Sequence, residues 1–183
     1  RLSKLFGLLA GLVLAGIPAL ALAASPDADR EKIRNQSQQV LAKLYEAQPS
    51  AKEFIAKSSG YATFSKWGLT LGPVGAGIGR GLAVAMPSGA ETFMRYVEGS
   101  AGAGFGVKKY ALIFVFENEH ARLNFVDNGW EAGAQTTLAV KPAGVGHAYE
   151  GAASVSPGVW VYQVTDKGLA AEIGLKGTKY YKD

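Results

Sequence analysis

Residues 75–81 read Gly-Ala-Gly-Ile-Gly-Arg-Gly, so that a glycine stands at every second position. Successive residues of a β-strand face opposite sides, so one face of this strand would be bare backbone. Residues 102–106, Gly-Ala-Gly-Phe-Gly, repeat the pattern. Each glycine weakens a strand by roughly 0.5–1 kcal/mol relative to alanine, so another group must approach the bare face closely. Tight packing within the protein is the favoured interpretation, and a groove for an acyl chain is the alternative.

The sequence around these glycines is typical of strands. From residue 60 onward Gly, Val, Thr, Tyr, Phe and Trp dominate, and a helical period is mostly absent. One helix is expected at 117–127, ended by Asn128-Gly129. We therefore predict a mainly β, α+β fold, in which N-terminal helices cover a Gly-rich antiparallel sheet or barrel with one inserted helix. Expected strands are 61–65, 68–72, 76–86, 91–99, 102–107, 110–116, 134–140, 158–164 and 169–176, with turns at 87–89, 108–109, 142–144 and 156–158.

Two helices are predicted before the strands. Ser25-Pro26-Asp27 begins the first, which is amphipathic, has acidic residues in its first turn and ends before Pro49. Ser50 is expected to cap a short second helix, with Glu53 completing a capping box. This helical segment, residues 24–57, is expected to form one compact domain with the β region, residues 58–183.

Residues 1–23 predict a secretory signal peptide. Arg1 and Lys4 precede an apolar run, and residues 21–23, Ala-Leu-Ala, form a small-x-small cleavage site. A membrane anchor is the alternative, but no basic stop-transfer residues follow the run. We expect cleavage after Ala23 and export to the periplasm or cell envelope, or secretion.

Charge and composition exclude several classes of function. Removal of residues 1–23 takes away two basic residues, so the formal charge falls from +4 to +2, which is too small to predict nucleic-acid binding. The chain has no cysteine. A thiol nucleophile, a cysteine-ligated metal and lipid attachment to a cysteine at position 24 are therefore excluded.

Catalytic and cofactor motifs are also incomplete. The spacing from Gly72 to Gly77 fits a phosphate-binding loop, but the lysine that should follow is missing. The nucleophile elbow Gly-x-Ser-x-Gly is not formed around Ser100. His120 and His147 are not part of any motif with metal-ligand spacing. We expect no enzyme activity, no metal and no cofactor.

Several segments, taken in order, resemble the SYLF domain family. They are residues 58–64, Ser-Ser-Gly-Tyr-Ala-Thr-Phe; the glycine run 75–81; residues 99–106; the apolar strand 111–116 with the helix ending near Phe125; and residues 159–162 and 167–173. The resemblance covers about residues 30–180. It implies lipid binding, because eukaryotic members bind phosphoinositides, while fungal members also bind actin filaments and bacterial members are exported. For an exported bacterial protein, actin is not the expected partner.

Cations beside aromatic residues give candidate lipid-binding positions. Aromatic rings favour the membrane interface, and each nearby Lys or Arg contributes about 1 kcal/mol with anionic lipid. The candidates are Lys66, Trp67, Arg80, Lys108 and Lys109. Ordinary solvated turns are the alternative, and Arg80 could instead form an ion pair with Glu98 or Glu172. The expected partner is a phospholipid or membrane surface, and the alternative is a structural or interaction domain, or surface antigen, with an envelope protein partner and no lipid.

Overall fold

The computed structural model describes residues 25–133, 136–139, 149–175 and 177–183. The predicted signal peptide (1–23) and the predicted turn at 142–144 lie outside these residues. The described part contains helices α1 (Pro26–Ala47), α2 (Ser50–Lys57) and α3 (Glu119–Asp127). Its strands are β1 (Gly60–Ala85), β2 (Glu91–Phe116), β3 (Trp130–Glu131), β4 (Thr136–Ala139), β5 (Ala153–Ser156), β6 (Val159–Thr165), β7 (Gly168–Leu169), β8 (Glu172–Leu175) and β9 (Thr178–Lys182).

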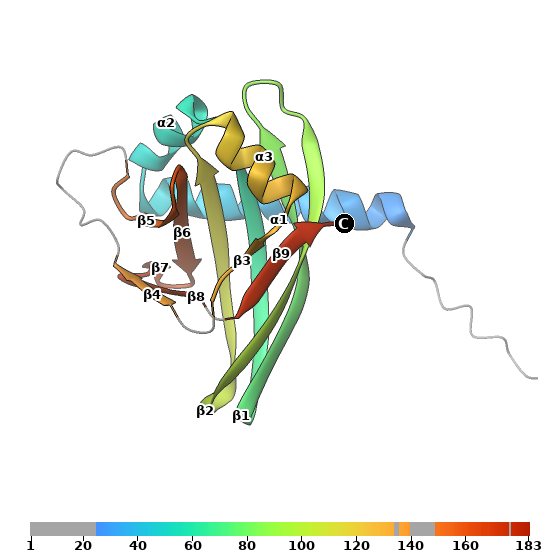
Figure 1. Ribbon diagram of the computed structural model, residues 1–183, viewed down its shortest axis with the longest axis vertical. Helices are drawn as coiled ribbons and strands as arrows, with labels where there is room; N and C mark the ends of the chain where they lie inside the picture. Colours follow the sequence, from blue (N-terminus) through green and yellow to red (C-terminus); the bar gives the residue numbers. More distant parts are fainter. Residues whose placement is uncertain (1–24, 134–135, 140–148, 176) are drawn as a thin grey trace, which may run out of the picture.

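A single long ribbon of two antiparallel strands, β1 and β2, organises the molecule. Pairing runs from Gly60 opposite Phe116 to Val84 opposite Glu91. Figure 1 shows both strands running to the lower end of the molecule, reversing there and returning. We call residues 60–66 with 110–116 the first arm, residues 77–84 with 91–98 the second arm, and residues 67–76 with 99–109 the ribbon end.

The ribbon corrects the predicted strand boundaries. Four separate strands were expected between residues 61 and 99 and two more up to 116, with a turn at 108–109. Instead, Lys108 and Lys109 lie within β2, opposite Gly68 and Trp67. The register shifts between Gly72 and Val74, so the intervening proline, which has no backbone N–H to donate, sits in a bulge. Gly and Pro usually end a strand, so the sequence suggested separate strands and turns. Here the bulge and the neighbouring glycines bend the strands without ending them.

Glycines allow the two arms to meet. A Cβ atom on Gly81 would overlap the ring of Phe64 and the carbonyl oxygen of Thr63, which belong to the other arm. A Cβ atom on Gly79 would lie 2.6 Å from the ring of Tyr96, the residue opposite it in the ribbon. At these two positions the bare face is filled by the protein's own rings, so tight internal packing, the favoured interpretation, is confirmed there.

The remaining strands extend the ribbon into a curled antiparallel sheet. Strand β6 pairs with residues 111–116 of β2, and β9 pairs with residues 94–98. The sheet order is β3-β9-β2-β6-β5, with β1 on β2 and β7 on β6, while β4 and β8 form a separate pair. The predicted α+β, mainly β class is therefore confirmed. Strands β3, β5 and β9 were not expected, and the strand predicted at 169–176 divides into β7 and β8.

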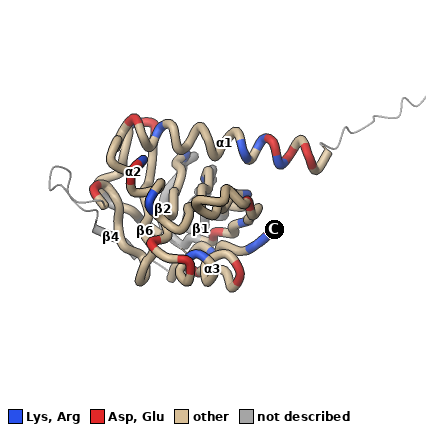
Figure 2. Tube along the Cα trace, turned by 90° about the horizontal axis from the view of Figure 1, so that it is seen from above, with Lys and Arg blue, Asp and Glu red and all other residues tan. Residues whose placement is uncertain are grey.

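Helix α1 covers the outside of both arms, as Figure 2 shows from above. Ile33 packs against Leu82 of the second arm, whereas Val40 and Leu44 pack against Ile113 and its neighbours in the first arm. The predicted start of this helix is confirmed, and Ser25 caps it, its hydroxyl accepting from the N–H of Ala28 at 3.2 Å. No helix in the described residues is both long and apolar enough to cross a membrane.

The predicted cap of α2 is wrong. Ser50 is the first helical residue, Pro49 occupies the cap position, and no side chain caps the helix. The hydroxyl of Ser50 instead accepts from Gln48 Nε2 at 2.7 Å, and Glu53 accepts from Lys57 Nζ at 2.6 Å. A lysine one turn later is a stronger partner for a carboxylate than a backbone N–H. The inserted helix α3 is confirmed, with Asn118 as its cap and Gly129 following Asn128 at a φ of 74°.

The interior holds two main apolar layers. The larger lies between the inner faces of the arms and is rich in aromatic rings, with Phe64, Phe114, Phe125 and Tyr180 in mutual contact. The second lies between the outer face of the first arm and helices α1 and α2. The arms therefore have no exposed apolar face where helices cover them.

We predict that Gly81→Ala lowers the free energy of unfolding by about 2 kcal/mol, because the added methyl group forces Phe64 and the Thr63 backbone apart. Gly99→Ala is the matched control, since no atom lies within 4 Å of the place that an added Cβ would take, and its change should be near zero or up to about 1 kcal/mol stabilising. Urea unfolding followed by fluorescence measures both. Equal losses in the two variants would contradict close packing of the arms at Gly81.

Candidate functional site

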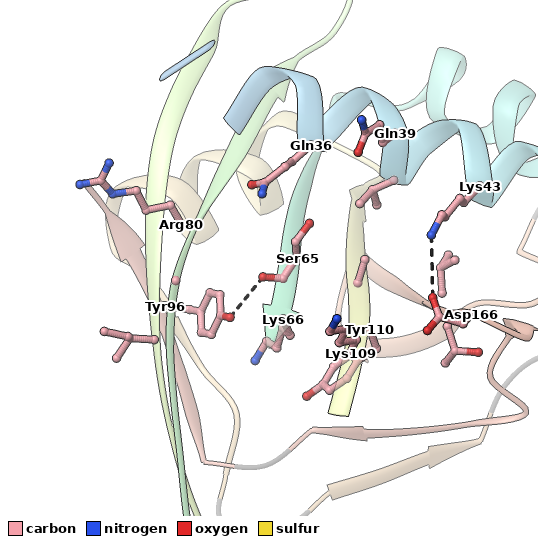
Figure 3. Close-up of a pocket in the computed structure, with 16 residues that line it drawn as sticks. Gln36, Gln39, Lys43, Ser65, Lys66, Arg80, Tyr96, Lys109, Tyr110 and Asp166 are labelled. Atoms are coloured by element: carbon pink, nitrogen blue, oxygen red, sulfur yellow. Dashed lines mark hydrogen bonds and ion pairs between the residues drawn. The ribbon is translucent and has the colours of Figure 1, made fainter. Parts of the chain in front are cut away.

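A cavity of about 640 Å³ lies under α1, between the two arms. Helix α1 forms its roof, the arms form its walls and the end of β6 closes one side, as Figure 3 shows. Its lining combines cationic, aromatic and apolar groups. The lining includes Val40 and Lys43 of α1; Lys66, Ile78 and Arg80 of β1; Tyr96, Lys109 and Tyr110 of β2; Val164 of β6; and Asp166, which follows β6.

Three of the predicted lipid-binding residues meet in this cavity, although they are far apart in the sequence. Lys66, Arg80 and Lys109 all line it. Lys109 is exposed, and its backbone pairs with that of Trp67. The side chains of Trp67 and Lys108, the other two candidates, lie outside the described part of the chain. The convergence results from the folding of the ribbon, which brings the first arm, with Lys66, beside the second arm, with Arg80.

Lys66 lines the cavity, and its side chain is buried in the interior. The residue is only 4% exposed. Its Nζ donates to Glu98 Oε2 at 2.7 Å and to Thr178 Oγ1 at 3.1 Å. The same ammonium lies 4.5 Å from the ring centroid of Tyr96 and 4.8 Å from that of Tyr180. A carboxylate, a hydroxyl and two aromatic faces thus compensate the charge, so the position of Lys66 is structural and not on the surface.

Burial shifts the pKa values of this cluster. It lowers the pKa of Lys66 below the usual 10.5, and the attraction of Glu98 partly opposes that change. Burial raises the pKa of Tyr110 far above 10, and the negative charge of Glu98 adds to the effect. Burial likewise raises the pKa of Tyr180. Around neutral pH the tyrosines therefore stay neutral while Lys66 and Glu98 form the ion pair.

Arg80 lies at the opposite edge of the cavity, on the outer face of the second arm. Its Nη1 lies 3.1 Å from Asp29 Oδ2 of α1, and its Nε lies 3.9 Å from Asp183 Oδ2. The predicted pairing with Glu98 is wrong, because Glu98 stands opposite Gly77 and faces Lys66 inside. Two residues of a strand that are an odd number of positions apart face opposite sides. Arg80 is three positions from Gly77, so it cannot share a face with Gly77 or with Glu98, which stands opposite Gly77. The side chain of Glu172, the other predicted partner, lies outside the described part.

Sequence reasoning missed the contribution of α1. Gln36, Gln39 and Lys43 face the cavity (Figure 3), and Lys43 Nζ lies 3.9 Å from Asp166 Oδ1 at the rim. Their spacing of three and four residues places them on one side of the helix. The sequence shows that these polar residues share one side of the helix. It does not show that the two arms lie beneath that side and form a cavity with it.

Tyr96 lines the cavity and lies between the two arms. Its hydroxyl donates to the carbonyl oxygen of Ser65 in the other arm at 3.2 Å, while its ring covers Gly79. The aromatic ring thereby bridges the arms and closes the space that an acyl chain would need along the glycines at this point. The predicted alternative, a groove on the glycine face, is not found at Gly81, whereas Gly79 lines the cavity together with Tyr96.

The chemistry of the cavity is that of binding. Besides the carboxylate of Asp166, the polar groups that line it include cations and amides, which donate hydrogen bonds to anionic oxygens. Within the described residues, no three His, Asp or Glu side chains come together as metal ligands would. His120 is exposed on α3, and His147 lies outside the described residues.

Sequence comparisons identify the family. Residues 97–183 match the family model described as Las17-binding protein actin regulator (Ysc84). A curated relative, Beta cell expansion factor A of Aeromonas veronii, is 32% identical over 154 residues, which cover 84% of this chain. The chain spans 57% of the length of that relative. Residues 97–183 therefore belong to the Ysc84, or SYLF-domain, family, a family of binding domains, and the resemblance seen in the sequence is confirmed.

The buried ion pair gives a prediction for stability. Glu98→Gln leaves the Lys66 ammonium without a counter-charge and should lower the free energy of unfolding by about 3 kcal/mol near neutral pH. Its control is Glu53→Gln at the exposed pair with Lys57, which should cost under about 1 kcal/mol. The double variant Lys66→Met with Glu98→Leu should be more stable than Glu98→Gln, because it removes both charges. Urea unfolding at fixed pH compares the variants.

The deficit of Glu98→Gln should also shrink with rising pH. Burial lowers the pKa of Lys66, so the unfolded chain holds this proton up to about pH 10.5 while the folded variant releases it earlier. The unfolded state therefore binds more protons, and stability relative to the unsubstituted protein rises toward pH 10. A deficit that stays constant from pH 7 to pH 10 would contradict the assignment of Lys66 as the unpaired charge.

Buried tyrosines predict loss of stability in strong alkali. Burial raises the pKa values of Tyr110, Tyr162 and Tyr180 above 10, whereas in the unfolded chain these phenols ionise near pH 10. Their contribution to stability is complete below pH 10 and is lost above it, because ionisation then favours unfolding. Absorbance at 295 nm and circular dichroism should show these phenols ionising together with unfolding. Ionisation of all eight tyrosines near pH 10 in a protein that stays folded would contradict their burial.

Proposed function

We propose that this protein is an exported, non-catalytic domain that binds anionic phospholipid at the cavity under α1. The observation that carries the proposal is the meeting of Arg80, Lys109 and Lys43 around one opening. Apolar side chains of Val40, Ile78 and Val164 lie between these cations. A cationic rim would bind the phosphate of a phospholipid, and an apolar wall would contact its acyl chains.

The size of the cavity is consistent with this ligand. A volume of about 640 Å³ lies within the range of roughly 300–1,000 Å³ that small-molecule sites occupy. It would hold a headgroup with the first part of an acyl chain.

The rim cations remain able to exchange partners. Arg80 is 41% exposed in its side chain, and the second of its two carboxylate contacts is 3.9 Å long, as is the contact of Lys43 with Asp166. Exposed ion pairs contribute only about 0–1 kcal/mol, so a phosphate group can compete for these side chains. Lys66 has no part in this step because its ion pair with Glu98 is buried.

The proposal concerns anionic phospholipid as a class, including phosphoinositide-like headgroups. Acidic and basic residues alternate along α1, as Figure 2 shows, so the helix is not a basic surface by itself. Selectivity for one headgroup would therefore depend on the rim cations. Export is proposed from residues 1–23 alone, with the periplasm, the cell envelope or the medium as the destination.

An envelope protein partner without lipid is the second candidate. The observation in its favour is that the protein's own rings fill the bare face at Gly79 and Gly81. Native mass spectrometry of the purified protein separates the two candidates. A retained phospholipid supports the first proposal, whereas a stable protein partner with no lipid supports the second.

Liposome flotation tests lipid binding directly. We expect the protein to float with vesicles of phosphatidylglycerol mixed into phosphatidylcholine, to bind pure phosphatidylcholine much more weakly, and to lose binding as salt rises. Lys109→Glu should weaken binding by about 2 kcal/mol, or roughly 30-fold, since it removes one cation and adds one anion. Lys52→Glu, at an exposed lysine of α2, makes the same charge change away from the cavity and should have a smaller effect.

The result that overturns the proposal is absence of flotation with either vesicle at low salt. Equal loss in Lys109→Glu and Lys52→Glu would contradict the position of the site, because it would show that only net charge matters.

A further inference from the structure

The ribbon end is a projection that carries no charge over most of its length. No charged residue occurs at 67–79 in β1 or at 99–107 in β2. The segment contains Trp67, Leu69, Leu71 and Phe105 among glycines and small residues. Figure 1 shows that it extends beyond the rest of the sheet, at the end opposite the turn that joins β1 to β2.

The ribbon end has little support from other strands. Among the described strands, β6 pairs with β2 at residues 111–116 and β9 pairs with it at 94–98, on either side of the ribbon end. Between these stretches β1 and β2 pair only with each other. A two-stranded ribbon is marginally stable in water without further packing. A bent, uncharged ribbon of this kind would gain stability from an apolar or interfacial environment.

Exposed apolar side chains lie at the base of the projection. Ile78 is 79% exposed and Val97, directly opposite it in the ribbon, is 40% exposed. Both lie on the second arm, and Ile78 also lines the cavity under α1. Isolated exposed apolar residues are common on proteins, but a cross-strand pair beside an uncharged projection extends one apolar surface.

Cations surround the same base. Lys109 is exposed and stands opposite Trp67, and the preceding residue, Lys108, stands opposite Gly68. Arg80 and Arg95 are paired across the second arm, and both side chains are more than 40% exposed. A segment without charge in its sequence, with exposed cations at its base, is complementary to an anionic membrane, which offers an apolar interior beneath a layer of phosphate groups.

We propose that the ribbon end inserts into the outer part of one leaflet of an anionic membrane, with Lys109 and Arg80 at the level of the phosphate groups. This inference rests on the proposed lipid-binding function, and it adds how the protein is oriented on the membrane. Insertion to that level places the opening of the cavity under α1 beside the headgroups, because Arg80 and Lys109 line both.

The unpaired backbone groups at the edges of the projection limit the depth of insertion, although the projection is long enough to cross one leaflet. Six residues, 67–72, span about 20 Å at roughly 3.3 Å per residue, whereas one leaflet contributes about 15 Å of hydrocarbon. Unpaired N–H and C=O groups along the outer edges of the ribbon cannot lie in dry hydrocarbon. The ribbon therefore enters at an angle and stays where water still reaches its edges.

A second copy of the chain is a poorer occupant. Two ribbon ends that packed together would bring their rings of Lys and Arg near each other, and like charges at an interface oppose association. Anionic lipid removes that repulsion and supplies the counter-charge. Concentration-dependent dimerisation without vesicles is accordingly an outcome that would overturn the proposal.

The absence of cysteine from the sequence permits a direct test with single labels. Thr70→Cys and Leu71→Cys place the environment-sensitive fluorophore NBD on adjacent residues of the ribbon end, at neighbouring positions of one strand. Ser88→Cys places it on the exposed turn at the other end of the ribbon and is the control. Fluorescence is measured with phosphatidylglycerol vesicles that carry nitroxide quenchers at a shallow or a deep position of the acyl chain, and flotation is measured on the same samples.

We expect NBD at 70 and 71 to shift to shorter wavelength on vesicle binding, with stronger quenching by the shallow nitroxide, and NBD at 88 to stay unchanged. Flotation without any change at 70 or 71 would overturn insertion and leave the proposed lipid binding intact. Failure to float would overturn both. Stronger quenching by the deep nitroxide, or an equal response at 88, would contradict shallow insertion by the ribbon end.

A pair of substitutions measures the contribution of the ribbon end to binding. Leu71→Asp should weaken partition into anionic vesicles about tenfold, because a carboxylate must enter the interface. Leu123→Asp makes the same change at an exposed leucine of α3 and should alter partition less than about twofold. Circular dichroism confirms folding of both variants. Equal partition of the two variants would overturn the role of the ribbon end.

Discussion

The contact between the two arms of the ribbon determines the rest of the structure. Gly79 and Gly81 leave room for the rings of Tyr96 and Phe64, and the ribbon can then double back on itself. A strand of 26 residues would otherwise extend about 85 Å, which no small domain could cover. Doubling back gives β2 a different neighbour in each half, β6 in one and β9 in the other. The glycines thus serve the fold first, and the cavity exists because the arms diverge just beyond them.

The buried pair of Lys66 and Glu98 links the fold to the cavity. It joins the first arm to the second, and Thr178 of β9 shares the same carboxylate and ammonium. An ion pair at this depth offers little net stabilisation compared with apolar packing, although breaking it is costly. Its effect is therefore to fix the arms in register rather than to hold them together. The rim cations Arg80 and Lys43, by contrast, are exposed and weakly paired, which suits the proposed exchange of a carboxylate for a phosphate.

The sequence predicted the class of fold, the helices and the family, because these follow from local patterns: a helix start at Ser25-Pro26-Asp27, a helix stop at Asn128-Gly129 and alternating glycines. Strand boundaries were wrong, because Gly and Pro that usually end strands here bend a continuous one. Candidate residues were chosen by type, and their convergence could not be predicted from spacing alone. The burial of Lys66 and the partners of Arg80 depend on which face each residue occupies after the ribbon has folded back, which is a property of long-range pairing.

The central claim is that one folded ribbon supplies both a packed interior and a membrane-facing end. Hydrogen–deuterium exchange of the backbone amides, measured with and without phosphatidylglycerol vesicles, tests it most directly. We expect vesicles to slow exchange at residues 67–76 and 99–109, with slow and unchanged exchange at 60–66 and 110–116, where the first arm packs on the aromatic interior. Vesicle-dependent protection confined to α2 or α3, with none in the ribbon end, would contradict it.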